Sequence, residues 1–160
     1  MRKLFSTAVV FITILCTSPN LFSQGNSVFL NPGIKLGYTY GENGGFTYGF
    51  KLSVTSNVLP EEPTLCYGVV FDIDFNKHWT KIHFGAEGNL ITLGLDIGPT
   101  LLIQNGTTTL GFSIIPYCGE LLYLYYNYSY FGKNMPAMSE LGMYLKYHTP
   151  IIGEGFHYRN

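Results

Sequence analysis

Charge is scarce in this sequence. Only 12% of its 160 residues are Asp, Glu, Lys or Arg, about half of the roughly 25% found in ordinary soluble domains. Nine basic residues against ten acidic ones give a formal net charge of −1 with no basic run, which excludes nucleic-acid binding driven by electrostatics. Intrinsic disorder is also excluded, because it combines high charge with low hydrophobicity, whereas 46% of these residues are hydrophobic.

The sequence also lacks an apolar run of the roughly 20 residues that a membrane-spanning helix needs. One shorter run, Ala8–Cys16, follows two basic residues and precedes the small residue Ser23. A positive start, a short apolar core and a small residue at the cleavage point make up a secretory signal. We therefore predict that residues 1–23 are a signal peptide, removed after Ser23. A buried N-terminal helix and a lipoprotein anchored at Cys16 are the alternatives.

What the rest of the chain has in abundance is alternation between apolar and polar residues with period 2, the pattern of β-strands with two different faces. Short turns rich in Gly, Asn and Pro separate the alternating segments, among them the hairpin signal Asn105-Gly106. The pattern predicts an all-β chain of hairpins. Its eight segments are Gly33–Tyr40, Phe46–Thr55, Leu65–Phe75, Lys81–Gly88, Ile91–Ile103, Thr108–Cys118, Leu121–Phe131 and Leu141–His148.

The two faces of these segments differ in a way that indicates which one points inward. The polar face has less charge than the roughly 25–35% of a soluble surface. Glycine and threonine dominate it, and small residues fit the narrow interior of an eight-stranded barrel. Tyrosine rings on the apolar face suit the girdles that surround membrane barrels. The aromatic residues of that face are Tyr38, Tyr40, Phe46, Tyr48, Tyr67, Phe75, Tyr126, Tyr128, Tyr130 and Tyr147.

Together these features favour a single antiparallel up-and-down transmembrane β-barrel of about eight strands, with its apolar face toward lipid. An open sheet is excluded in a membrane because its edge would leave backbone groups without hydrogen bonds. The alternative is a soluble exported barrel, which would turn the apolar face inward and bind an apolar ligand there.

Over about residues 29–148 the sequence resembles the small outer-membrane β-barrel proteins of Gram-negative bacteria. The signal end Phe22-Ser23-Gln24 is similar to that of exported proteins from Bacteroidetes-type bacteria. The resemblance implies an outer-membrane location, contact with outer-membrane lipid, and recognition by the barrel assembly machinery during biogenesis.

The last predicted strand also resembles the assembly signal of that family, which places a glycine, a hydrophobic residue and an aromatic residue at fixed spacing. Gly142, Leu145 and Tyr147 match it. The family's last strand usually ends the chain, whereas this chain continues beyond it. We therefore divide the sequence into a signal peptide (1–23), a barrel domain (24–148) and a C-terminal tail (149–160).

Eight ionisable side chains share the polar face and therefore the predicted barrel interior: Lys35, Lys51, Asp72, Asp74, His83, Glu87, Asp96 and Lys146. Unpaired charges in a narrow interior are costly. We predict that these residues pair with one another in an internal network. The alternative is that Asp72 and Asp74, two residues apart on one face, bind a cation or act as acid and base.

No pattern for catalysis, a cofactor or a metal stands out. His78 and His83 flank a turn without the Cys or acid that would complete a zinc site. Ser113, His83 and Glu87 could supply a hydrolase triad by composition only. Neither G-x-S-x-G nor a phosphate-binding loop occurs. We predict that the protein is not an enzyme and holds no cofactor or metal.

Signal cleavage leaves two of the three cysteines, Cys66 and Cys118. Export makes a disulfide chemically possible. Strand parity, however, places Cys66 on the polar face and Cys118 on the apolar face, in strands that are not neighbours. We predict two free thiols.

Two functions remain from the sequence. The first is a small outer-membrane barrel with an interior filled by side chains, serving as a structural or surface-interaction protein with an unknown surface partner. The second is the soluble periplasmic or secreted barrel with an apolar ligand inside.

Overall fold

The structure is a computed structural model that describes residues 28–41, 43–57, 65–90, 92–132 and 135–152. The predicted signal peptide and its cleavage point lie outside the described residues. No helix in the described part of the chain is long and apolar enough to cross a membrane.

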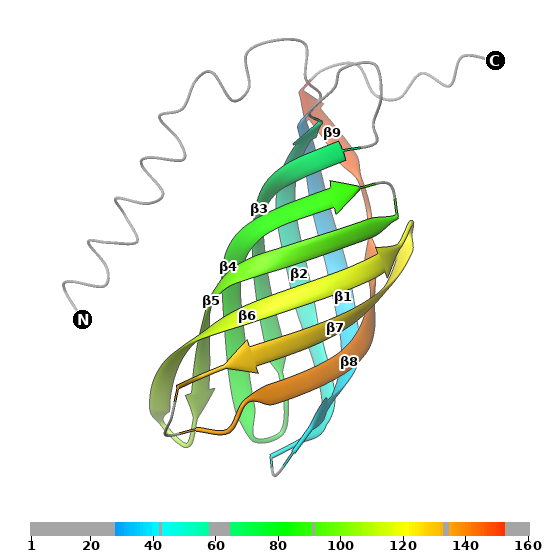
Figure 1. Cartoon of the computed structure of the whole chain (residues 1–160). Helices are drawn as coiled ribbons and strands as arrows, with labels where there is room; N and C mark the ends of the chain where they lie inside the picture. The colour runs from blue at the N-terminus through cyan, green and yellow to red at the C-terminus, as the bar shows by residue number, and fades with distance from the viewer. Residues whose placement is uncertain (1–27, 42, 58–64, 91, 133–134, 153–160) are drawn as a thin grey trace, which may run out of the picture.

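The described residues form nine β-strands (Figure 1). Their bounds are β1 Val28–Tyr40, β2 Gly45–Asn57, β3 Leu65–Phe75, β4 Trp79–Leu90, β5 Leu93–Gln104, β6 Thr107–Gly119, β7 Leu122–Tyr130, β8 Met138–Lys146 and β9 Thr149–Ile152.

The first eight strands form a closed antiparallel barrel. Each pairs with the next along the chain, and β1 pairs with both β2 and β8, so the sheet closes on itself. Tight turns explain the up-and-down order: Asn105 and Gly106, between β5 and β6, both have positive φ angles, as the Asn-Gly hairpin signal predicts. The predicted all-β, eight-stranded barrel is confirmed.

Strand β9 continues the line of β8 along β1. β8 pairs with β1 from Gly33 onward, whereas β9 pairs with Val28–Leu30. Between them, the amide of Tyr147 donates to the carbonyl of Pro32 at 3.0 Å, and Pro32 has no N–H to donate in return. The sheet therefore extends four residues into the segment predicted as a tail.

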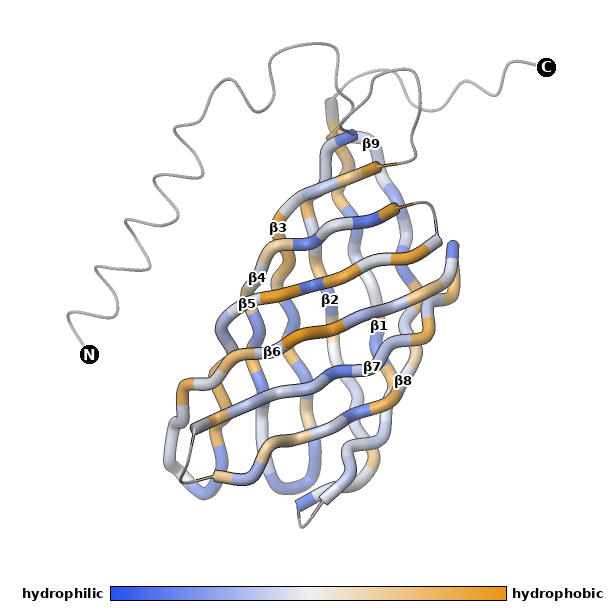
Figure 2. Tube along the Cα trace, viewed as in Figure 1, coloured by the Kyte–Doolittle hydropathy of each residue, from blue (hydrophilic) through white to orange (hydrophobic). Residues whose placement is uncertain are grey.

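Hydropathy alternates along much of the barrel wall (Figure 2), and the apolar residues of the alternation are the exposed ones. Phe50 in β2 is 57% exposed, whereas its neighbour Lys51 is 2% exposed. A soluble protein buries its apolar residues, whereas a membrane barrel exposes them to lipid. The predicted orientation of the two faces is therefore confirmed.

Aromatic and apolar side chains fill the two ends of the interior. Toward the β6–β7 turn, Ile115 packs with four tyrosines: Tyr117, Tyr123, Tyr125 and Tyr144. Toward the opposite end, Trp79, Leu102 and Phe131 form a second cluster, and two methionines pack against it. The indole N–H of Trp79 donates to the carbonyl of Asn43 in the β1–β2 turn at 3.1 Å, so this turn lies over the end of the barrel.

Cys66 and Cys118 are both free, as predicted. The Cys66 thiol is half-buried and donates to the side-chain oxygen of Asn57 at 2.9 Å, whereas Cys118 is exposed on the outer wall. We expect a maleimide reagent to modify Cys118 faster than Cys66 in the detergent-solubilised protein, and non-reducing mass spectrometry to find no linked peptide pair. Equal labelling rates, or a disulfide, would contradict the register of β3 or β6.

Candidate functional site: the ionic interior of the barrel

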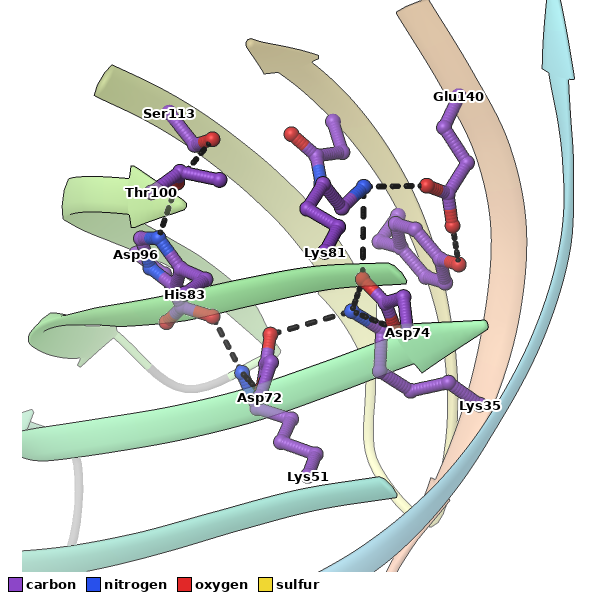
Figure 3. Close-up of polar contacts among 12 residues, drawn as sticks. Lys35, Lys51, Asp72, Asp74, Lys81, His83, Asp96, Thr100, Ser113 and Glu140 are labelled. Carbon is purple, nitrogen blue, oxygen red and sulfur yellow. Dashed lines mark hydrogen bonds and ion pairs between the residues drawn. The ribbon is translucent and has the colours of Figure 1, made fainter. Parts of the chain in front are cut away.

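An alternating chain of charges crosses the interior (Figure 3). The Lys35 ammonium lies 3.1 Å from a carboxylate oxygen of Asp72 and 3.0 Å from one of Asp74. Lys51 lies 3.8 Å from the other oxygen of Asp72 and donates to Asp96. All five side chains are buried. Each ammonium therefore stands between two carboxylates, which offsets the cost of burying them.

Glycine at position 49 makes the Lys35–Asp74 pair possible. Gly49 of β2 stands between Lys35 of β1 and Asp74 of β3 in the register of the sheet. A Cβ at Gly49 would lie 2.4 Å from Oδ1 of Asp74. The missing side chain thus leaves room for a lysine to reach across one strand to the next.

The chain of charges continues from Asp74 toward β8. Lys81 lies 3.4 Å from Asp74 and 2.6 Å from Glu140. Glu140 also accepts hydrogen bonds from the hydroxyls of Tyr125 and Thr47, the latter at 3.2 Å. One carboxylate of β8 is therefore tied to β2, β4 and β7 at once.

A second group of charges lies nearer the β6–β7 turn. Lys146 of β8 pairs with Glu87 of β4. The hydroxyl of Tyr117 donates to Glu87 at 2.8 Å, and also contacts the side-chain oxygen of Asn89. Aromatic rings add to the stabilisation of the lysines: the Lys51 ammonium lies 5.1 Å from the ring centre of Tyr144, within the range of a cation–π interaction.

His83 belongs to a row of hydroxyl groups rather than to an ion pair. Its Nδ1 lies 3.0 Å from the Thr100 hydroxyl, which lies 2.5 Å from that of Ser113. Ser113 in turn contacts Ser129 at 2.7 Å, and Ser129 donates to Asn127. Histidine and serine are thus linked through Thr100, but all of these groups are buried, so a substrate could not reach them without an opening of the barrel.

All eight of the residues assigned to the interior from the sequence lie there, each at most 2% exposed. Seven take part in ion pairs, and His83 bonds to Thr100. Lys81 and Glu140, which complete the chain of charges, were not among the predicted interior residues. Parity could have found both, because Lys81 has the parity of His83 in β4 and Glu140 has that of Lys146 in β8.

At the open rim near β9, His148 follows the end of β8. Its ring contacts the side-chain oxygen of Asn31 at 2.7 Å and the hydroxyl of Tyr123 at 3.2 Å. Partial burial, together with the nearby positive charge of Lys146, holds the pKa of His148 below its ordinary value. The imidazole is therefore neutral at pH 7 and accepts or donates as a neutral ring.

Gly142, the glycine of the proposed assembly signal, has a packing role in the structure. A Cβ at this position would lie 2.7 Å from the ring and hydroxyl of Tyr125 and 2.5 Å from the carbonyl of Leu36. Leu145 and Tyr147 point outward and are exposed. The close approach of Tyr125 and of the Leu36 carbonyl therefore explains, on packing grounds alone, why a side chain is excluded at position 142.

We expect Gly142→Val to destabilise the barrel by about 1–3 kcal/mol, the usual cost of overpacking, because Tyr125 must leave its position beside Glu140. Gly88→Val is the matched control, since nothing lies within 4 Å of a Cβ there. Refolding of purified protein into detergent separates the two roles. A Gly142→Val variant that refolds normally, yet fails to assemble in cells, would assign this glycine to recognition rather than to packing.

Within the described residues, no group of three or more His, Cys, Asp or Glu side chains is arranged to hold a metal ion. Four lysines face five carboxylates in the interior (Lys35, Lys51, Lys81 and Lys146; Asp72, Asp74, Glu87, Asp96 and Glu140). The lysines offset all but one of the carboxylate charges inside the barrel, so the described interior has a formal excess of one negative charge.

A closed eight-stranded sheet, an exposed apolar wall and a buried ionic interior define a small transmembrane β-barrel with a filled interior. No family model and no curated protein matches the chain. Three solved structures are similar to it at low sequence identity.

The first is the crystal structure of Neisserial surface protein A (NspA), with 16% identity and a TM-score of 0.44 over 77% of this chain and 98% of that one. The second is a de novo designed transmembrane β-barrel, with 14% identity and a TM-score of 0.42 over 74% and 95% of the two chains. The third is Ail, the attachment invasion locus protein of Yersinia pestis, with 10% identity and a TM-score of 0.27 over 79% and 100%.

Proposed function

We propose that this protein is an exported outer-membrane barrel with a structural or surface-interaction role, and that it neither conducts solutes nor catalyses a reaction. The observation that carries the proposal is the pairing of buried lysines with buried carboxylates across the interior, behind a wall of exposed Phe, Tyr, Leu and Ile side chains. Eight strands leave an interior just wide enough for side chains to fill.

Lipid of the outer membrane is the partner of the outer wall, and the barrel assembly machinery is the partner during biogenesis. A surface partner would contact the connections between strands, which range from two residues between β5 and β6 to seven between β2 and β3 and between β7 and β8. The alternative of a soluble barrel with an apolar ligand inside is not favoured, because the interior holds charges where such a ligand would need an apolar lining.

Cell fractionation tests the location directly. We expect the mature protein to sediment with the outer membrane and to need detergent for solubility, because the exposed apolar wall has no compensating charged surface. Recovery of soluble monomer from the periplasm would overturn the proposal.

Planar-bilayer recordings test the filled interior. We expect the purified protein to show negligible conductance, because opening a path would require the buried ion pairs to separate. The variant Trp79→Ala, which removes an aromatic side chain from one end but leaves the ion pairs, is expected to stay closed as well. Steady single-channel currents from the unmodified protein would show that the interior is water-filled and that the strand number or oligomeric state differs.

A further inference from the structure

Backbone pairing is unequal around the barrel. Between β4 and β5, Phe84 and Gly85 lack the backbone pairing that their neighbours have, although the pairs on either side keep the same register. The residue that would face Phe84 is Pro99, which has no N–H to donate.

The second interruption lies between β6 and β7. Here the pairs stop at Ile114 and resume at Tyr117, and Pro116 lies in the gap. Prolines are normally confined to edge strands and bulges, yet both of these lie in the middle of a strand. The other seams among the first eight strands, as far as the structure describes them, run without a gap.

The two interrupted seams enclose one hairpin. Within it, β5 and β6 pair without a break from Leu93 and Cys118 to Gln104 and Thr107. β7 likewise pairs without a break with β8. The hairpin is thus a continuous unit that has lost backbone bonds on both of its outer edges.

The interior charges are also distributed unequally among the strands. Eight of the nine interior charges belong to β1, β2, β3, β4 and β8, and these strands are joined to one another by ion pairs. The hairpin contributes one charge, Asp96, which pairs with Lys51. Its remaining polar links are hydrogen bonds: Thr100 to His83, Ser113 to Ser129, and Tyr117 to Asn89 and to the carboxylate of Glu87. The Tyr117 ring also faces the ammonium groups of Lys51 and Lys146, at 5.5 and 6.0 Å from its centre.

We propose that the β5–β6 hairpin is the moving part of the barrel wall. It separates transiently as a unit along the β4–β5 and β6–β7 seams, while the ion-paired strands from β8 through β1 to β4 stay closed. An open edge is costly in a membrane because backbone groups lose their hydrogen bonds, and these two seams have the fewest pairs to lose in their middle sections. Such an opening exposes the interior sideways to the bilayer, and it withdraws Leu102 from one end cluster and Ile115 and Tyr117 from the other. The Lys51–Asp96 pair acts as the latch, because it is the one ion pair that crosses from the hairpin to the rest of the described wall.

Hydrogen exchange followed by mass spectrometry, on the full mature chain in lipid bilayers, tests the proposal. We expect amides throughout β5 and β6 that face the two seams to exchange at least about tenfold faster than those of β1–β3, the factor that corresponds to about one hydrogen bond. Asp96→Asn is expected to accelerate exchange in β5 and β6 alone. Uniform exchange around the barrel, or fastest exchange in another strand pair, would overturn the proposal.

A missing hydrogen bond could by itself speed exchange beside each proline without any movement of the hairpin. A disulfide across the seam distinguishes the two cases. In a Cys66→Ser, Cys118→Ser background, Ile82→Cys with Leu101→Cys joins two paired outward residues of β4 and β5. We expect this bond to slow exchange at amides of the β4–β5 seam far from Pro99, near Gln104 and Leu93. Ile97→Cys with Ile114→Cys, which joins β5 to β6 inside the hairpin, is the control and is expected to have no such effect.

Replacing each proline by alanine restores the missing backbone N–H donor and gives an independent test. Pro99→Ala and Pro116→Ala are each expected to slow exchange across their seam about tenfold. Pro32→Ala is the matched control, because Pro32 lies where pairing passes from β8 to β9 rather than beside the hairpin. Equal effects of all three substitutions on β5–β6, equal effects of the two disulfides, or no effect of any variant would each overturn the proposal. None of these outcomes bears on the outer-membrane location or on the absence of conductance, which fractionation and planar-bilayer recording test separately.

Discussion

Lys35→Met is expected to destabilise the barrel by about 3–5 kcal/mol, the usual cost of removing one partner from a buried ion pair. Lys35 is the ammonium that separates Asp72 from Asp74, at 3.1 and 3.0 Å. Without it, two buried carboxylates on the same face of β3 lose their shared counter-charge, and the substituted methionine offers no hydrogen bond. Urea unfolding of the protein in lipid vesicles, followed by the fluorescence of Trp79, measures the change in the free energy of unfolding.

Lys77→Met is the control, because Lys77 lies exposed in the β3–β4 turn and its charge contributes little there. A triple variant, Lys35→Met with Asp72→Asn and Asp74→Asn, is expected to recover part of the loss because it removes the unpaired charges. If Lys35→Met cost no more than Lys77→Met, the interior would have to be hydrated, and the ion pairs would not be sealed from water.

Strand parity, which depends only on the period of 2, was enough to predict the fold and eight of the ten buried Lys, Asp, Glu and His side chains, all but Lys81 and Glu140. It assigned Lys35, Lys51 and Asp72 to the same side of the wall without any knowledge of which strands touch where. Ile115, an apolar residue on the polar face, was an exception to the alternation. The structure explains it, because Ile115 packs in the interior among four tyrosines.

The partners of each charge could not be predicted in the same way, because they depend on register. Lys35 bonds to Asp74 across Gly49 only because β1, β2 and β3 are offset so that these residues stand in one row. A shift of one residue in a single turn would reverse the faces of a strand, whereas a shift of two would keep the faces and change every pair. The sequence pattern cannot distinguish between registers that differ by two residues.

Phe50→Arg is expected to reduce the stability of the folded barrel in a bilayer by about 2–4 kcal/mol, the range for a cation at the midplane on the lipid side of a barrel. Phe50 lies near the middle of β2, points outward and is 57% exposed. It pairs with Ile34 on one side and Ile73 on the other, so no polar neighbour on these strands could accept the guanidinium. Equilibrium folding into vesicles of defined thickness measures the effect.

Phe46→Arg is the matched control for this substitution. Phe46 has the same residue type, strand and face, and is 62% exposed, but it lies beside the β1–β2 turn. Near the interface the same change costs about 0–1 kcal/mol, because the guanidinium reaches water and lipid headgroups. The difference between the two variants therefore reports depth in the membrane. If the outer wall of this barrel lay in water, both positions would face solvent, and arginine would be tolerated equally at each. Equal costs at positions 46 and 50 would accordingly place the wall outside the bilayer, whereas a cost confined to position 50 fixes the middle of β2 near the membrane midplane.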